Sequence, residues 1–196
     1  MARSRISIAK PDIVRHFEEA NQRVYTRRQL EEHLASNRRF WRLTESMTVQ
    51  AFVQYLLQNT KLQLHKFSLP NRPTDRYTWG DASTLELVQS LRPEGYFSHF
   101  TALQLHGLTD QDPKTIYLNF EQQSSGGDGE LRQQSIDGAF KRNCRVSNNR
   151  TEFNDTTICL LNGRNTGCLG VQPLDVTLTE ATVRATNVAR TLIDIV

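Results

Sequence analysis

The chain has 196 residues, 37% of them hydrophobic and 23% charged, which is ordinary for a globular protein with one large or two small domains. We expect neither a secretory signal nor a membrane-spanning helix, because no apolar run is long enough for either. The odd number of cysteines without CxxC spacing favours a reduced cytoplasmic protein with inert thiols at Cys144, Cys159 and Cys168.

The formal net charge of +3 is unevenly distributed. Residues 1–80 carry 14 Lys and Arg against 7 Asp and Glu, a net of +7, whereas residues 81–196 carry 10 against 14, a net of −4. A basic first part followed by an acidic second part indicates a nucleic-acid reader joined to a domain that does not bind nucleic acid. Chance variation between two solvated surfaces is the alternative.

Three helices are predicted in the first eighty residues. The first starts at Pro11, and the second and third start after the capping residues Thr26 and Thr48. Apolar residues recur three and four positions apart within each segment, which is typical of helices that face a common core. These positions are Ile13, Val14, Phe17, Leu30, Leu34, Val49, Phe52, Val53, Leu56 and Leu57.

A β-hairpin is predicted after the third helix. Leu62, Leu64 and Phe67 alternate as in a strand, residues 68–75 are rich in turn formers, and residues 76–79 fit the returning strand. Three helices followed by a hairpin is the order of a winged helix-turn-helix domain, which we place at residues 8–80. Its third helix would enter the major groove of DNA, and its wing would reach the backbone.

Gln50 and Gln54, on the outward face near the start of the third helix, are the expected base readers, because glutamine can bond adenine bidentately. Arginines before this helix and basic residues on the wing are expected to contact phosphates. Ordinary solvated polar positions are the alternative for both sets. The full predicted DNA-binding set is Arg27, Arg28, Arg38, Arg39, Arg42, Thr48, Gln50, Gln54, Lys66, Arg72 and Arg76.

Residues 82–196 read as a mixed α+β domain. In "GYFSHFTALQLHGLTDQDPKTIYL", residues 95–118, Ser98 is the expected helix cap, Gly107 the expected helix end, and a strand follows. His99 and His106 lie seven residues apart, about 10.5 Å along a helix, and therefore cannot share one zinc ion. The stretch is predicted to be scaffold.

The remaining elements of this domain are predicted from shorter signals. A helix over residues 131–143 would turn Leu131, Ile136 and Phe140 inward, after a Gly/Ser loop at 124–129. Residues 156–171 are expected to form a hairpin with its turn at Asn162-Gly163. A strand at 181–185 and a final helix capped by Thr186 complete the α+β assignment.

Four stretches resemble, in order, the AbiEi-type antitoxins, the transcriptional-regulator halves of bacterial toxin–antitoxin pairs that act in abortive infection. The resemblance covers about residues 95–196 and implies autorepression at operator DNA with inverted repeats. It also implies neutralisation of a nucleotidyltransferase toxin as the protein partner. The stretches are "GYFSHFTALQLHGLTDQDPKTIYL", "SIDGAFKRNCRVSNN", "ICLLNGRNTGCLGV" and "VRATNVARTLID".

The sequence departs from the family pattern near its end. Val188 and Ala189 stand where relatives usually carry glutamate, so Thr186 lacks the acidic partner of a capping box. The pattern of an apolar helix is still running at residue 196, and we expect that the domain is incomplete.

An enzyme of another class, a metal-dependent nuclease subunit, is the alternative function. Its signature, an acidic residue and a lysine two positions apart, occurs as Asp112-Pro113-Lys114. Proline cannot donate to a sheet ladder and fits a catalytic strand poorly. We therefore expect no enzyme activity, no metal and no cofactor.

Overall fold

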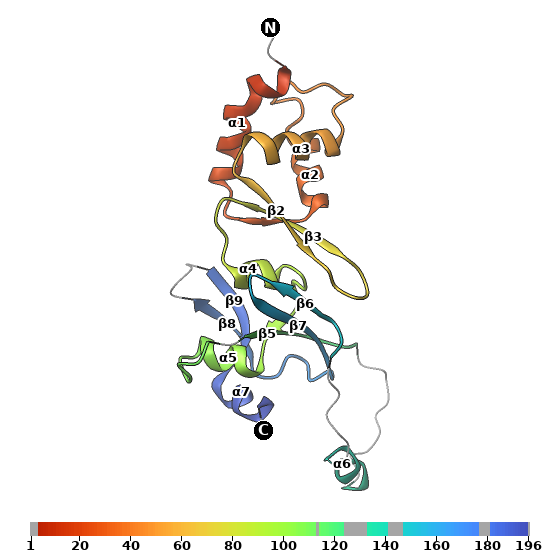
Figure 1. Ribbon diagram of the computed structural model, residues 1–196, viewed down its shortest axis with the longest axis vertical. Helices are drawn as coiled ribbons and strands as arrows, with labels where there is room; N and C mark the ends of the chain where they lie inside the picture. The colour runs from red at the N-terminus through yellow and green to blue at the C-terminus, as the bar shows by residue number, and fades with distance from the viewer. Residues whose placement is uncertain (1–3, 113, 124–132, 141–146, 177–180, 196) are drawn as a thin grey trace. The chain divides into compact units, whose positions relative to one another are not determined.

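The computed structural model describes residues 4–112, 114–123, 133–140, 147–176 and 181–195. The chain is a mixed α+β protein with two sheets (Figure 1). It divides into two compact units, Met1–Ser68 with Arg72–Leu91, and Leu69–Asn71 with Arg92–Val196. Within these residues, no helix is both long and apolar enough to cross a membrane.

The first unit contains three long helices and a three-stranded antiparallel sheet (Figure 1). The sheet order is β1-β3-β2, so the short strand between the first two helices pairs with the returning strand of the hairpin. The elements are α1 (Arg5–Glu19), β1 (Val24–Tyr25), α2 (Arg27–Asn37), α3 (Val49–Asn59), β2 (Leu62–Phe67), β3 (Thr74–Trp79) and α4 (Thr84–Gln89).

The predicted second and third helices are confirmed, and the first begins earlier than expected. Thr26 forms a capping box with Gln29, and the Thr48 hydroxyl accepts from the Ala51 amide at 3.2 Å. The first helix begins at Arg5, after the cap Ser4, and continues through Pro11. An interior proline costs about 3 kcal/mol, and burial of Ile6 and Ala9 in the core offsets that cost.

One apolar core holds the first unit together. Phe17 stacks on Trp79 with ring centroids 4.7 Å apart, and Trp41 stacks on Phe52 at 5.8 Å. The predicted inward positions lie in or against this core: Ile13, Phe17, Leu30, Leu34, Phe52, Val53 and Leu56 are buried, and Val14, Val49 and Leu57 are partly buried. The unit extends past residue 80, where the predicted domain ends, to include α4, whose capping box is Ser83 with Glu86.

The second unit is built on a six-stranded mixed sheet of order β6-β7-β5-β4-β9-β8. The β5–β7 and β4–β9 pairs are parallel, and the others are antiparallel. Helices α5 and α7 pack against each other beside this sheet (Figure 1). The elements are β4 (Tyr96–Phe97), α5 (His99–Leu105), β5 (Thr115–Glu121), α6 (Gln133–Phe140), β6 (Arg150–Phe153), β7 (Thr156–Gly163), β8 (Val171–Val176), β9 (Ala181–Thr186) and α7 (Val188–Asp194).

The predicted hairpin over residues 156–171 is wrong. Strand β7 pairs with β6 and β5, whereas β8 pairs with β9. The tight turn lies instead at Asn154 and Asp155, which both have positive φ, 47° and 60°. Gly163 ends β7 opposite Glu121, and a Cβ there would lie 2.7 Å from the Asn119 amide nitrogen. The glycine thus permits a close side-chain approach rather than a turn.

The cap of the last helix differs from expectation. Asn187, not Thr186, caps α7, and its side chain accepts from the Arg190 amide at 2.9 Å. The Thr186 hydroxyl is buried and bonds the Thr191 hydroxyl at 2.8 Å. Helix α6 is present, but Leu131 and the side chains of Ile136 and Phe140 lie outside the described residues.

Candidate functional site

The exposed face of α3, formed by Gln50, Ala51, Gln54 and Gln58, is the main candidate surface of the first unit. Its opposite face buries Phe52, Val53 and Leu56, so packing fixes which side of the helix meets solvent. The two predicted base readers lie on this exposed face, four residues apart. Neither glutamine side chain bonds another residue in the described part of the chain, so both amides are available to a ligand.

The loop from 38 to 48 positions the start of α3, and Arg38 holds this loop together. Its guanidinium donates to the Thr44 carbonyl at 2.5 Å and to the Met47 carbonyl at 3.0 Å. Trp41 and Leu43 of the same loop are buried. Arg38 is therefore half-buried and engaged within the loop, and its predicted phosphate contact stays a prediction.

The other arginines near α3 are exposed. Arg39 and Arg42 lie on the surface of the loop, and Arg42 has a positive φ of 53°. A residue with a side chain in this region costs roughly 1–2 kcal/mol, so the loop conformation is held against strain. Arg27 and Arg28 lie at the exposed start of α2, where Arg28 pairs with Glu32 at 3.0 Å.

The basic residues of the hairpin divide into two kinds. Lys66 on β2 and Arg72 in the turn are exposed, and Lys66 stands opposite Asp75 in the strand register. Arg76 instead donates to Ser90, at 3.1 Å to the hydroxyl and 2.9 Å to the carbonyl. Burial lowers the pKa of Arg76 against the opposing effect of Asp75. Arg76 thus joins the hairpin to the end of α4, a contact with no local sequence signal.

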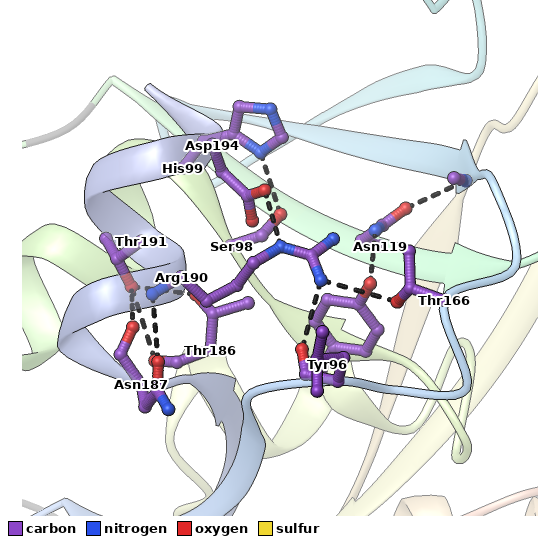
Figure 2. Close-up of polar contacts among 12 residues, drawn as sticks. Tyr96, Ser98, His99, Asn119, Thr166, Thr186, Asn187, Arg190, Thr191 and Asp194 are labelled. Carbon is purple, nitrogen blue, oxygen red and sulfur yellow. Dashed lines mark hydrogen bonds and ion pairs between the residues drawn. The ribbon is translucent and has the colours of Figure 1, made fainter. Parts of the chain in front are cut away.

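The second unit contains a connected polar network between its sheet and α7 (Figure 2). Arg190 donates from Nε to Asp194 at 2.7 Å, and from Nη1 to the Thr166 hydroxyl at 3.3 Å and the Leu169 carbonyl at 3.0 Å. The Asn119 amide donates to the Tyr96 hydroxyl at 2.8 Å. The Arg190 contacts join α7 to the segment between β7 and β8, and the Asn119–Tyr96 bond joins β5 to β4.

Glu121 fixes the same segment from the sheet side. Its carboxylate accepts from the Thr166 hydroxyl, from the Thr166 and Cys168 amides at 2.7 and 3.1 Å, and from the Tyr96 hydroxyl at 3.0 Å. Burial acts to raise the pKa of Glu121, but these hydrogen bonds outweigh it and lower the pKa to about 2. Burial, with the bond to Glu121, raises the pKa of Tyr96 to about 12.

The two histidines of the 95–118 stretch bind different partners. His99 Nδ1 lies 2.8 Å from the Ser98 hydroxyl (Figure 2), and His106 Nε2 lies 2.7 Å from the Thr186 carbonyl. Ser98 precedes α5 as predicted, but its hydroxyl serves His99 instead of capping the helix. Among the described residues, no group of three or more His, Cys, Asp or Glu is arranged to hold a metal ion.

Two of the three predicted inert thiols are described. Cys159 is buried in β7 and Cys168 is half-exposed, both as free thiols, while Cys144 lies outside the described residues. Comparison of the chain with models of protein families and with curated proteins finds no match.

Proposed function

We propose that the chain is a cytoplasmic, DNA-binding transcriptional autorepressor and the antitoxin of a nucleotidyltransferase toxin, acting in abortive phage infection. The first unit would be a winged helix-turn-helix domain, with α3 as recognition helix and the β2–β3 hairpin as wing. The second unit would neutralise the toxin. This second half of the proposal rests on the resemblance of residues 95–196 to AbiEi-type antitoxins.

The observation that carries the DNA-binding proposal is the exposed face of α3. The Thr48 cap and the apolar face fix this helix, and its glutamine amides, which bond no other residue in the described ranges, lie on the face away from the core. Exposed Arg27, Arg39 and Arg42 on the same unit supply charges for phosphates. Sequence-specific recognition in a major groove combines polar groups that read bases with cations that contact phosphates.

Binding titrations on the chain's own promoter and on a scrambled duplex, at several salt concentrations, test this assignment. Gln50→Ala and Gln54→Ala should each cost roughly 1–3 kcal/mol on the promoter and leave scrambled DNA almost unaffected. Arg39→Ala should weaken both duplexes equally and flatten the log–log salt dependence by about one unit. Glutamine variants that weakened both duplexes equally would exclude α3 as the recognition helix.

The antitoxin part is tested in cells. Co-expression of the protein with a nucleotidyltransferase toxin encoded beside its gene should restore growth that the toxin alone arrests. Gln50→Ala should lose promoter repression but keep this rescue, because it changes only the proposed DNA surface. Absence of rescue by the well-expressed protein would reject the antitoxin part and leave the DNA-binding part standing.

A further inference from the structure

A hollow of about 710 Å³ lies on the first unit between the start of α1 and the loop after α2. Ile8 and Phe40 line it and are 65% and 71% exposed, while Trp41, also lining it, is buried at 2%. Large apolar side chains exposed together around a hollow on this scale mark an interaction surface more often than isolated exposed residues do. We call this surface the α1 hollow.

Three charged residues line the α1 hollow, Arg5 and Asp12 from α1 and Arg42 from the loop after α2. Arg5 and Asp12 both line it, seven residues apart on one side of α1, with Ile8 between them. Two helical turns, about 10.5 Å, separate their backbone positions. Neither side chain makes a hydrogen bond or an ion pair with another residue that the structure describes.

We propose that the α1 hollow is the interface between two copies of this chain, with the two α1 helices antiparallel about a two-fold axis beside Ile8. Arg5 and Asp12 lie at nearly equal distances on either side of Ile8, three and four residues away. Antiparallel packing at this point places Arg5 of each copy opposite Asp12 of the other. A two-fold interface must be self-complementary in this way.

A second copy fits this surface because the two charges that α1 contributes, Arg5 and then Asp12, face their opposites when two α1 helices lie antiparallel. The central contact would be Ile8 against Ile8, covered by Phe40 from each copy, with one Arg–Asp pair at each end. Each copy contributes one end of a helix and one loop, so we expect a transient dimer that dissociates on the order of micromolar concentration. The inference does not depend on DNA binding, although a two-fold dimer would present two α3 helices to an inverted repeat.

Charge reversal tests the pairing without DNA. In sedimentation experiments on the 196-residue chain at low salt, Arg5→Glu and Asp12→Arg should each lower the dimer association constant by about tenfold or more. An equimolar mixture of the two variants should recover dimers. In the mixed dimer, one end pairs the carboxylate introduced by Arg5→Glu with the guanidinium introduced by Asp12→Arg. The other end pairs the unchanged Asp12 of the Arg5→Glu copy with the unchanged Arg5 of the Asp12→Arg copy. Far-UV circular dichroism confirms that each variant is folded.

A wild-type chain that stays monomeric at hundreds of micromolar, or a mixture of folded variants that does not recover dimers, would overturn the proposal. Cross-linking provides a second measurement that does not change the charges. Ile8→Cys should be joined across the two-fold axis by a short bifunctional maleimide, and the matched exposed variant Ala35→Cys on α2 should not. Equal cross-linking of both variants, after subtracting the wild-type background, would also overturn it.

Discussion

Arg38 and Arg39 are neighbours in sequence, but their side chains have different environments. Arg38 is half-buried and donates to the carbonyls of Thr44 and Met47, whereas Arg39 is exposed. A run of arginines before a predicted recognition helix indicates phosphate binding for both. Nothing local in the sequence distinguishes them, because the partners of Arg38 are set by the path of the whole loop.

We predict that Arg38→Ala lowers the free energy of unfolding by about 1–3 kcal/mol, since two charge-assisted hydrogen bonds are lost. It should weaken promoter and scrambled DNA alike, and a purely structural role in the loop would leave the salt dependence unchanged. Arg39→Ala, the matched control, should change stability by less than about 0.5 kcal/mol. Urea denaturation and salt titrations measure both. A salt slope reduced by about one unit in Arg38→Ala would instead support a phosphate contact.

His16 of α1 and His33 of α2 form a pair inside the first unit, with Nε2 and Nδ1 2.9 Å apart. Tyr25 and Trp41 contact the pair from β1 and from the loop after α2. Burial lowers the pKa of His16, partly opposed by Glu19. Burial and then His16 lower the pKa of His33, partly opposed by Glu32. One ring must donate to the other, so the folded pair does not accept two protons readily.

The sign of the resulting pH dependence follows from these shifts. Both histidines have a lower pKa in the folded state than the unfolded value of 6.5. The unfolded state therefore binds more protons just below pH 6.5. The free energy of unfolding should keep its full contribution from this pair above pH 6.5, and it should decrease as the pH falls towards the folded pKa values. Both tryptophans, Trp41 and Trp79, lie in the first unit, so their emission during denaturation reports on it. His33→Gln should reduce this dependence, and an unchanged profile would contradict it.

At the scale of elements, the sequence predicts best what local contacts determine. Helices α2 and α3 and the β2–β3 hairpin were predicted because their caps and apolar spacing lie within each segment. The exposure of Gln50 and Gln54 follows from the same helical period. The start of α1 differs from the prediction because a proline normally marks a first turn, whereas packing of Ile6 and Ala9 extends the helix before Pro11.

Strand pairing in the second unit was not predictable from local signals. Asn162-Gly163 is a strong turn pair by composition, yet Gly163 pairs with Glu121, 42 residues earlier in the chain, and its amide donates to Asn119 at 2.9 Å. The contacts that outweigh the turn preference come from β5, which lies too far from Gly163 in the sequence for a local pattern to reveal them. The Glu121 contacts to Thr166 and Cys168 are of the same long-range kind.

Glu121 should therefore hold the segment between β7 and β8 in place. We predict that Glu121→Gln lowers the free energy of unfolding by about 1–3 kcal/mol at pH 7, because an amide has one acceptor oxygen instead of two. The folded pKa of about 2 lies below the ordinary 4.5, so the wild-type advantage should be present above about pH 4.5 and lost as the pH falls towards 2.

Thermal denaturation of wild type and Glu121→Gln at pH 7 and pH 3 measures this difference. Glu152→Gln is the matched control, since Glu152 is an exposed carboxylate on β6 that accepts a single side-chain bond, from Thr157 at 2.8 Å. It should change stability by less than about 0.5 kcal/mol. A Glu121→Gln effect that is the same at both pH values would show that the carboxylate charge is not responsible.

At the scale of the whole molecule, the two units differ in charge as well as in architecture. The first, Met1–Ser68 with Arg72–Leu91, carries 14 Lys and Arg against 9 Asp and Glu, a net of +5. The second carries 10 against 12, a net of −2. The boundary after Leu91 follows the contact of Arg76 with Ser90. A boundary at residue 80 would divide that contact.

The division predicts two separable activities. A fragment of residues 1–91 should bind DNA, and it should melt at a higher temperature than residues 1–80, because only the longer fragment keeps α4 and the Ser90 partner of Arg76. A fragment of residues 92–196 should bind duplex DNA weakly, since its net charge is negative and phosphate attraction dominates non-specific affinity.

Tryptophan emission follows the melting of the fragments 1–91 and 1–80, because each contains Trp41 and Trp79. Anisotropy titrations at low salt measure DNA affinity for all three, and equal DNA affinity of residues 92–196 and residues 1–91 would contradict the assignment of DNA binding to the first unit.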